Sequence, residues 1–167
     1  MEANSEPKLT AKQNRLMAIK FFLFSTSAGL IEAGSYAILS EFTNIDKLTG
    51  FDEIFGNEHG LTYFIALALS VIWNFTLNRK FTFKSAANVP IAMLKVLAFY
   101  LVFAPLSIWW TVELTSIGWN NYLVLVLTMV VNFVTEFLYW RFVVYRKNIY
   151  TSEAGRRELA EQEKTQG

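Results

Sequence analysis

The chain of 167 residues contains no cysteine and a single histidine, His59. Without cysteine it has no disulfide, no thiol chemistry and no thiolate metal site, and one histidine does not make a histidine-based metal site. The sequence also lacks a glycine-rich phosphate loop and a nucleophile with a suitable base. We therefore expect a protein that is not an enzyme, with no catalytic residue, no cofactor, no metal site and no nucleic-acid partner.

Charged residues are few, at 17% of the chain, where a soluble domain has about 25%. Charges are missing from 60–78 and 114–135, and 21–40 and 85–112 hold one each. About 20 apolar residues cross a bilayer core as a helix, and these stretches lack the polar stripe that a soluble bundle helix exposes. We predict an all-α integral membrane protein with four transmembrane helices, near 20–42, 60–79, 90–113 and 120–142.

The positive charges are distributed unevenly along the chain. Every lysine and arginine except Lys47 lies in 1–20, 79–95 or 141–167. Because positive residues concentrate on the cytoplasmic side, this pattern places both termini and the middle loop inside and the loop 43–60 outside. The polar first 20 residues show no signal-peptide pattern, so we expect the first helix to insert the chain itself.

These boundaries predict three parts in a multi-pass protein of the cell (cytoplasmic) membrane. Residues 1–15 would form a cytoplasmic N-terminal tail, 16–147 a four-helix transmembrane domain, and 148–167 a cytoplasmic C-terminal tail. The C-terminal tail is charged and mixed in sign, which is typical of a frayed helix or a disordered segment.

The chain contains an internal similarity. Two pairs of segments match: AIKFFLF (18–24) with MLKVLAF (93–99), and NFTLNRKFTFK (74–84) with EFLYWRFVVYR (136–146). The match predicts two helical hairpins as parallel repeats, each starting and ending in the cytoplasm (N-in/C-in). Transporters commonly have such repeats, with a substrate site at their interface. The alternative is that two membrane ends have converged on similar anchors.

The matched segments carry the candidate site residues. Arg79 and Lys80 follow one apolar run directly, and Arg141 takes the matching place on the last helix. Asn74 and Glu136 lie five residues earlier, about 7.5 Å deeper along a helix. Guanidinium groups bind phosphate through paired hydrogen bonds. We interpret the cluster as a phosphate site with polar groups behind it, or else as ordinary anchoring of cations and aromatics at the membrane surface.

Glu32 is the second candidate, because it lies 12 residues, about 18 Å along a helix, beyond Lys20. A charged carboxylate at that depth costs about 2.5–3.5 kcal/mol, so the side chain should face the helix bundle or a wet cavity. The alternative is a carboxyl group hydrogen-bonded across helices, beside the small residues of 27–35 that favour close helix contact. Lys20 and Lys95 are interpreted as headgroup anchors.

The endings of the second and fourth helices resemble the GtrA-like family. N-F-x-x-N-R-x-F-x-F starts at Asn74 and E-F-x-x-x-R-x-x-V-Y starts at Glu136, within a resemblance that covers about 15–147. The resemblance implies a four-helix membrane protein that moves a polyprenyl-phosphate-linked monosaccharide from the cytoplasmic leaflet to the outer one. The sugar would then be used to glycosylate a cell-surface polysaccharide or teichoic acid.

The resemblance also implies roles and partners. Arg79, Arg141 and Lys80 would bind the phosphate of the lipid headgroup. The sugar or its polar path would be met by four further residues, Asn74, Asn78, Glu136 and Glu32. The implied partners are the polyprenyl-phosphate sugar lipid, membrane lipids and membrane glycosyltransferases, and a homodimer would give the four helices a larger wall for a groove.

Two other functions compete with translocation. A non-transporting adaptor that holds a glycosyltransferase at the membrane would need the charged surface and not Arg79, Arg141 or Glu32. A small proton-coupled multidrug exporter has one glutamate in its first helix, as Glu32 would be. The exporter fits the arginines and the strong charge bias poorly.

Overall fold

A computed structural model of the chain describes residues 9–43, 45, 49–50 and 60–166. These residues form helices and turns without any strand, and four of their helices are long and apolar enough to cross a membrane. The predicted all-α fold with four helices of membrane-spanning length and apolarity is confirmed. Most of the predicted outer loop 43–60 and the first eight residues lie outside the described part. The four spans are Ala11–Phe42, Leu61–Thr82, Val89–Ser116 and Asn121–Val144.

Helix α1 (Ala11–Phe42) begins well before residue 20, where its apolar run starts. The Thr10 hydroxyl accepts a hydrogen bond from the Gln13 backbone N–H at 3.2 Å, and Gln13 Oε1 accepts one from the Thr10 N–H at 2.7 Å. This reciprocal capping box satisfies two N–H groups that a helix start leaves unpaired. The polar residues that follow Thr10 therefore join the helix.

The chain forms two compact units. The first unit is Ile19–Thr82, and the second combines Met1–Ala18 with Phe83–Gly167. The boundary crosses α1, so that the first two turns of this helix belong to the second unit.

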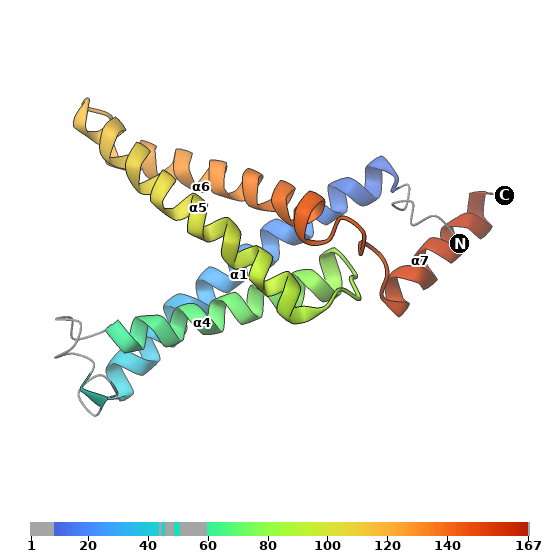
Figure 1. The fold of residues 1–167 in the computed structure, drawn as a ribbon, viewed down its shortest axis with the longest axis horizontal. Coiled ribbons are helices and arrows are strands. Elements are labelled where there is room, and N and C mark those ends of the chain that lie inside the picture. The colour runs from blue at the N-terminus through green and yellow to red at the C-terminus, as the bar shows by residue number, and fades with distance from the viewer. Residues whose placement is uncertain (1–8, 44, 46–48, 51–59, 167) are drawn as a thin grey trace. The chain divides into compact units, whose positions relative to one another are not determined.

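The first unit is an antiparallel hairpin of α1 and α4 (Gly60–Leu77), whose ribbons run side by side in Figure 1. Ring contacts join the helices near both ends. The Phe24 and Phe81 ring centroids are 5.9 Å apart, and those of Tyr36 and Tyr63 are 6.5 Å apart.

The α4 face that continues into Thr82 carries a polar stripe. Ser70, Asn74, Asn78 and Thr82 recur every four residues and so share one face. Ser70, Asn78 and Thr82 are buried. The sequence interpretation that the apolar stretches lack a polar stripe is therefore wrong for this helix. The membrane assignment stands, because a soluble bundle would expose its polar face and this one is buried.

The small residues of 27–35 pack less closely within the chain than the sequence suggested. Ala28 is buried, but a Cβ placed on Gly29 or Gly34 would meet no atom within 4 Å. Close helix contact in the first unit therefore does not depend on these two glycines.

The second unit contains an antiparallel hairpin of α5 (Val89–Ser116) and α6 (Asn121–Tyr139) (Figure 1). Trp110 Nε1 donates to Thr128 Oγ1 at 2.8 Å toward the connecting turn. The Phe99 and Tyr139 rings are in contact toward the open end, with centroids 5.2 Å apart and planes tilted by 41°. α5 continues as a helix through Pro105.

Asparagine caps set where the helices of this hairpin begin. Asn88 Oδ1 accepts from the Ile91 N–H at 3.2 Å, and Asn120 Oδ1 accepts from the Tyr122 N–H at 2.9 Å. Both are typical N-cap bonds. The turn between α5 and α6 contains Gly118 at φ 92°, a conformation that strongly favours glycine.

Both hairpins end in a π-helical turn. α4 continues into η1 (Asn78–Thr82) and α6 into η2 (Trp140–Val144). In η2 the Tyr145 N–H donates to the Trp140 carbonyl at 2.9 Å, five residues back along the chain. Such turns are rare and often occur at functional sites. The helices predicted to end at 79 and 142 are each extended by this turn.

The C-terminal residues form α7 (Glu153–Gln166), a helix with defined contacts in the second unit. The preceding segment pairs with the residues after η1: the Tyr150 N–H donates to the Phe83 carbonyl at 2.8 Å, and the Ser152 N–H to the Lys84 carbonyl at 2.9 Å. Lys84 and Tyr150 both adopt positive φ, 45° and 58°. These hydrogen bonds offset the cost of that conformation.

Side chains then hold α7 against the rest of the second unit. Lys84 forms an ion pair with Glu158, and its ammonium group lies 5.0 Å from the centre of the Tyr150 ring. Burial raises the pKa of the Tyr150 phenol, and its hydroxyl donates to Glu158 Oε1 at 3.3 Å. Gln13 Nε2 donates to Gln162 Oε1 at 2.8 Å, so α7 is also tied to the start of α1. For the segment 148–167 the sequence predicts a frayed helix or a disordered segment. The structure has a helix over Glu153–Gln166.

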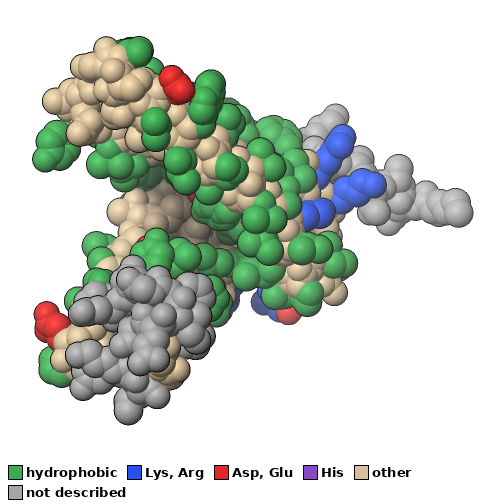
Figure 2. All heavy atoms as spheres, turned by 60° about the vertical axis from the view of Figure 1, so that its left-hand side comes forward, with side chains coloured by type: hydrophobic (Ala, Val, Ile, Leu, Met, Phe, Trp, Pro, Cys, Tyr) green, Lys and Arg blue, Asp and Glu red, His purple; other side chains and the backbone are tan. Residues whose placement is uncertain are grey.

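The outer surfaces of the membrane-spanning helices are apolar. Figure 2 shows hydrophobic side chains over much of the visible surface. Leu30 and Leu101 are exposed, at 72% and 68%. Such a surface suits lipid acyl chains, which bury apolar side chains that water would not tolerate in this number.

Candidate functional site

Arg79 and Lys80 lie in the π-helical turn η1, at the charged end of the first hairpin. Lys80 is exposed, and its ammonium group lies 5.1 Å from the centre of the Phe81 ring. Arg79 is half-buried. The turn therefore presents two cations beside aromatic side chains, as the sequence predicted for either an anchor or a phosphate site.

A chain of hydrogen bonds runs from this turn into the hairpin. Thr82 Oγ1 donates to Asn78 Oδ1 at 2.8 Å, and Asn78 Nδ2 donates to Asn74 Oδ1 at 2.7 Å. Asn74 Oδ1 also accepts from Ser25 Oγ on α1 at 3.3 Å. We call these four side chains the polar ladder. Asn78 is fully buried. Its Oδ1 accepts from Thr82 and its Nδ2 donates to Asn74, so its amide links these two residues.

Further polar contacts join the two helices deeper in the hairpin. Trp73 Nε1 donates to Ser27 Oγ at 3.0 Å, and Ser70 Oγ lies 3.0 Å from Glu32 Oε2 as a donor. Glu32 therefore faces α4, as expected of an intramembrane acid that must face the bundle. This bond matches the alternative of a carboxyl group hydrogen-bonded across helices.

Arg141 lies in η2, the corresponding turn of the second unit. Its Nη1 donates to Asn14 Oδ1 at 2.6 Å and to Met17 Sδ at 3.5 Å, both on the first turns of α1. The guanidinium carbon also lies 5.4 Å from the centre of the Phe142 ring. Of these two partners, Asn14 lies in the segment 1–15, which the sequence predicts to be a tail.

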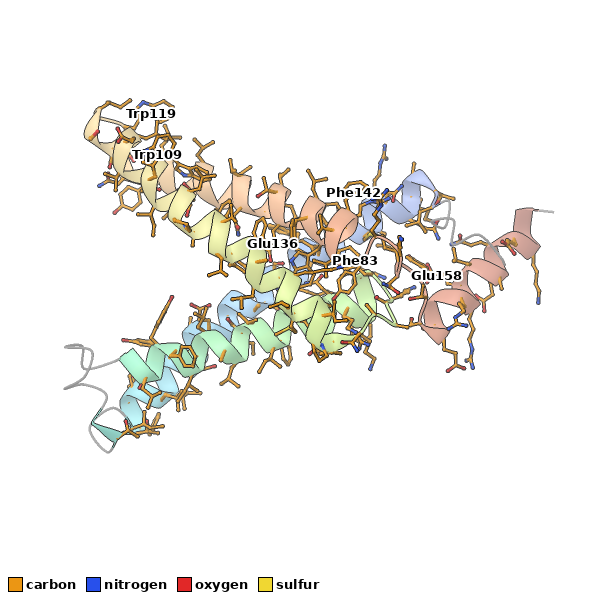
Figure 3. The ribbon with its side chains drawn as sticks, in the orientation of Figure 1. Phe83, Trp109, Trp119, Glu136, Phe142 and Glu158 are labelled. Atoms are coloured by element: carbon orange, nitrogen blue, oxygen red, sulfur yellow. The ribbon has the colours of Figure 1, made fainter. Side chains whose placement is uncertain are left out.

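Glu136 is buried in the second hairpin, with 3% of its surface exposed (Figure 3). Tyr100 on α5 donates its hydroxyl hydrogen to Glu136 Oε1 at 2.8 Å. A buried acid needs such a partner, because an unpaired polar group in an apolar surrounding is costly.

Three features of the site were missed in the sequence. Asn14 was not singled out as a partner of Arg141. Asn132 has a buried Oδ1 with no hydrogen-bond partner among the described residues. Its signal in the sequence is an amide in the interior of the apolar stretch 122–134, where a polar side chain needs a partner as Glu32 does. Lys20 and Lys95, which the sequence predicts to be headgroup anchors, both donate to main-chain carbonyls.

The predicted site residues divide between the two units. Glu32, Asn74, Asn78, Arg79 and Lys80 belong to the first unit. Glu136 and Arg141 belong to the second. A joint phosphate site made by both arginines stays a prediction.

Comparison with known proteins returned no match: no family model, no curated protein and no solved structure is similar to the chain. The resemblance to the GtrA-like family therefore rests on the two helix-ending motifs and the four apolar spans.

Proposed function

We propose that the chain is a GtrA-like protein that translocates a polyprenyl-phosphate-linked monosaccharide across the cytoplasmic membrane, for glycosylation of a cell-surface polysaccharide or teichoic acid. One observation carries the proposal. Each hairpin ends in a π-helical turn with an arginine, Arg79 or Arg141, and has a hydrogen-bonded polar side chain five residues deeper, Asn74 or Glu136.

Internal contacts support a two-repeat arrangement. Ser25 donates to Asn74 in the first hairpin, and Tyr100 donates to Glu136 in the second. The donors are 75 positions apart and the acceptors 62, the same separations that relate the similar sequence segments. The π-helical turns 78–82 and 140–144 are also 62 positions apart. We propose parallel repeats with both termini in the cytoplasm, which follows the positive charge bias.

The arginines are the proposed phosphate ligands. A guanidinium has five N–H donors in a planar fork that matches phosphate oxygens. The contacts of Arg141 with Asn14 and Met17 both use Nη1, which orients the fork. Lys80, which is exposed, adds a positive charge at the entrance. Such charge-assisted bonds are strongest where water is partly excluded.

The polar ladder and Glu32 form the proposed path for the headgroup. A lipid tail can stay in the acyl region while only the phosphosugar crosses, so the protein has to offer polar partners along part of the span. The first hairpin places such partners from Thr82 to Ser25 and deeper at Glu32. Sugar hydroxyls can exchange with these partners because they both donate and accept hydrogen bonds.

This function implies other components. One membrane glycosyltransferase would load the sugar on the inside and another would use it outside. A homodimer would surround the headgroup more completely than one four-helix chain.

The test is a transbilayer assay in proteoliposomes that contain a fluorescent polyprenyl-phosphate-hexose. We expect wild-type protein to speed exchange between leaflets, and Arg79→Gln or Arg141→Gln to slow it by at least tenfold, since losing one charge-assisted contact costs about 1.5–3 kcal/mol. Lys147→Gln is the matched control, because Lys147 is an exposed cation that follows η2. It should leave the rate unchanged.

One structural observation favours the adaptor as a second candidate. α7 is a defined helix with exposed Arg156 and Arg157, a surface that a glycosyltransferase could contact. The adaptor predicts equal, slow lipid movement in wild type and in both arginine variants, and that result would replace the translocation proposal.

A further inference from the structure

The two lysines near the charged ends of the hairpins contact protein carbonyls. Lys20 Nζ on α1 lies 3.5 Å from the Phe81 carbonyl oxygen, and Lys95 Nζ on α5 lies 3.1 Å from the Val143 carbonyl oxygen. Both lysines are half-buried. A lysine that serves only as an anchor would extend its ammonium group into the headgroup region.

The carbonyls that the lysines contact lie at helix ends. The last carbonyls of a helix lack an intrahelical donor and carry the negative end of the helix dipole. A lysine there satisfies a carbonyl and stabilises the final turn. Phe81 belongs to η1 and Val143 to η2, so both contacted carbonyls lie within the π-helical turns.

The two contacts occupy matching positions. Lys20 and Lys95 are 75 positions apart, and Phe81 and Val143 are 62 apart, as are Arg79 and Arg141. In each hairpin the contacted carbonyl comes two residues after the arginine. The same contact at matching places in two independently described units is poorly explained by chance placement of two flexible side chains.

We propose that Lys20 and Lys95 are positioning residues: each fixes the π-helical turn of its own hairpin and thereby orients the arginine on that turn. The contact between each lysine and its turn does not depend on the proposed function. The inference rests on that function only where it says that the oriented arginine binds phosphate. Lys95 should have the larger effect, because its contact is shorter and falls within the ordinary hydrogen-bond range.

The geometric part can be measured without transport. The chain has no cysteine, so a single nitroxide label can be placed at Lys80→Cys or Phe142→Cys, exposed and equivalent positions on the two turns. In bilayers we expect Lys20→Met to increase label mobility at 80 and Lys95→Met at 142. Lys20→Arg and Lys95→Arg, which keep a long cationic donor, should restore the wild-type spectrum.

The functional part uses the proteoliposome assay on full-length protein without a label. We expect Lys95→Met to raise the half-saturating concentration of the polyprenyl-phosphate-hexose on the order of tenfold, the equivalent of one weakened charged contact. Lys95→Arg should return it to within about twofold. A merely structural lysine would lower the amount of folded protein and leave the half-saturating concentration unchanged.

The possible results separate the two proposals. Label spectra that are unchanged by both Lys→Met variants overturn the positioning inference, whatever the transport result. Wild-type translocation that Arg79→Gln abolishes and Lys→Met leaves intact overturns the inference and keeps the proposed function. Absence of translocation by wild type overturns the proposed function, and with it the role of the lysines in phosphate binding.

Discussion

The Asn78 side chain links α4 to the π-helical turn η1 in the first hairpin. Its amide accepts from Thr82 and donates to both the side chain and the main-chain carbonyl of Asn74. The residue is fully buried. When one partner of a buried hydrogen bond is removed, the polar group that remains is left buried and unpaired. The desolvation cost of that group is larger than the net contribution of the hydrogen bond to stability.

Asn78→Leu should therefore destabilise the fold. The substitution keeps a similar volume but leaves the Thr82 hydroxyl and the Asn74 carbonyl oxygen with fewer partners, at a cost of about 1–3 kcal/mol. Thermal unfolding of the purified protein in detergent measures the change. Thr76→Ala, on the exposed side of the same helix, is the control and should unfold like wild type. Equal stability of Asn78→Leu and wild type would contradict the role given to the ladder.

Tyr100 and Glu136 allow a matched test in the second hairpin. Tyr100→Phe removes only the hydroxyl that donates to the buried carboxyl group, so we expect a loss of about 1 kcal/mol, the scale of hydrogen bonds inside membrane proteins. Glu136→Gln keeps an acceptor and should cost less. A double-mutant cycle with Glu136→Leu isolates the pair. Tyr122→Phe, at a tyrosine that is 78% exposed, is the control; additive effects in the cycle would disprove the coupling.

The charged residues of the site could be found in the sequence, whereas their partners could not. Arg79, Arg141 and Glu32 stand out because charge is rare in apolar runs. The contact between Arg141 and Asn14 spans 127 positions, and no local pattern encodes a contact at that separation. For Lys20 the residue itself was found but its role was not. A lysine near a helix end can be a headgroup anchor or a donor to a helix-end carbonyl, and the sequence is the same in both cases.

At the scale of elements, the lengths of the apolar stretches predicted the four spans. The residues at which the helices begin and end depend instead on capping hydrogen bonds and on the π-helical turns. The capping box at Thr10 has the sequence pattern T-x-x-Q, which the sequence analysis did not use. The π-helical turns could not be predicted, because a one-residue change of hydrogen-bond register leaves no signal in composition. The docking of α7 depends on Lys84 and Tyr150, which are distant in sequence from each other.

Gly155 tests how α7 is held. A Cβ at this position would lie 2.6 Å from the Tyr150 Cα, a contact that side chains do not make, and the obstacle is main chain. Gly155→Ala should therefore displace α7, although alanine favours helix more than glycine does. Trypsin should then cleave at the exposed Arg156 and Arg157 roughly tenfold faster, as expected when a local opening becomes about 1.4 kcal/mol easier.

The control for this change is the same substitution where space is open. At Gly34 an added Cβ meets no atom within 4 Å, so Gly34→Ala should leave cleavage of the C-terminal helix at the wild-type rate. Protection of α7 in Gly155→Ala equal to that of wild type would show that the helix is not seated on Tyr150.

At the scale of the whole molecule, the proposed repeat relates two hairpins that share several contacts. In each, a lysine on the first helix contacts the final turn of the second, a hydroxyl group bonds a polar side chain below an arginine, and the turn itself is π-helical. The sequence similarity predicts which residues correspond, and that correspondence stays a prediction. It could not predict what the residues contact, since an alignment of two segments carries no information about pairing across a hairpin.

The most direct test of the central claim compares two lipids in wild-type proteoliposomes: a fluorescent polyprenyl-phosphate-hexose, and the same polyprenyl chain joined to the hexose without the phosphate. We expect rapid exchange of the phosphorylated lipid only, a preference of at least tenfold that disappears in the double variant Arg79→Gln, Arg141→Gln. Equal exchange of both lipids by wild type, or a preference that survives the double variant, would contradict phosphate recognition by these arginines.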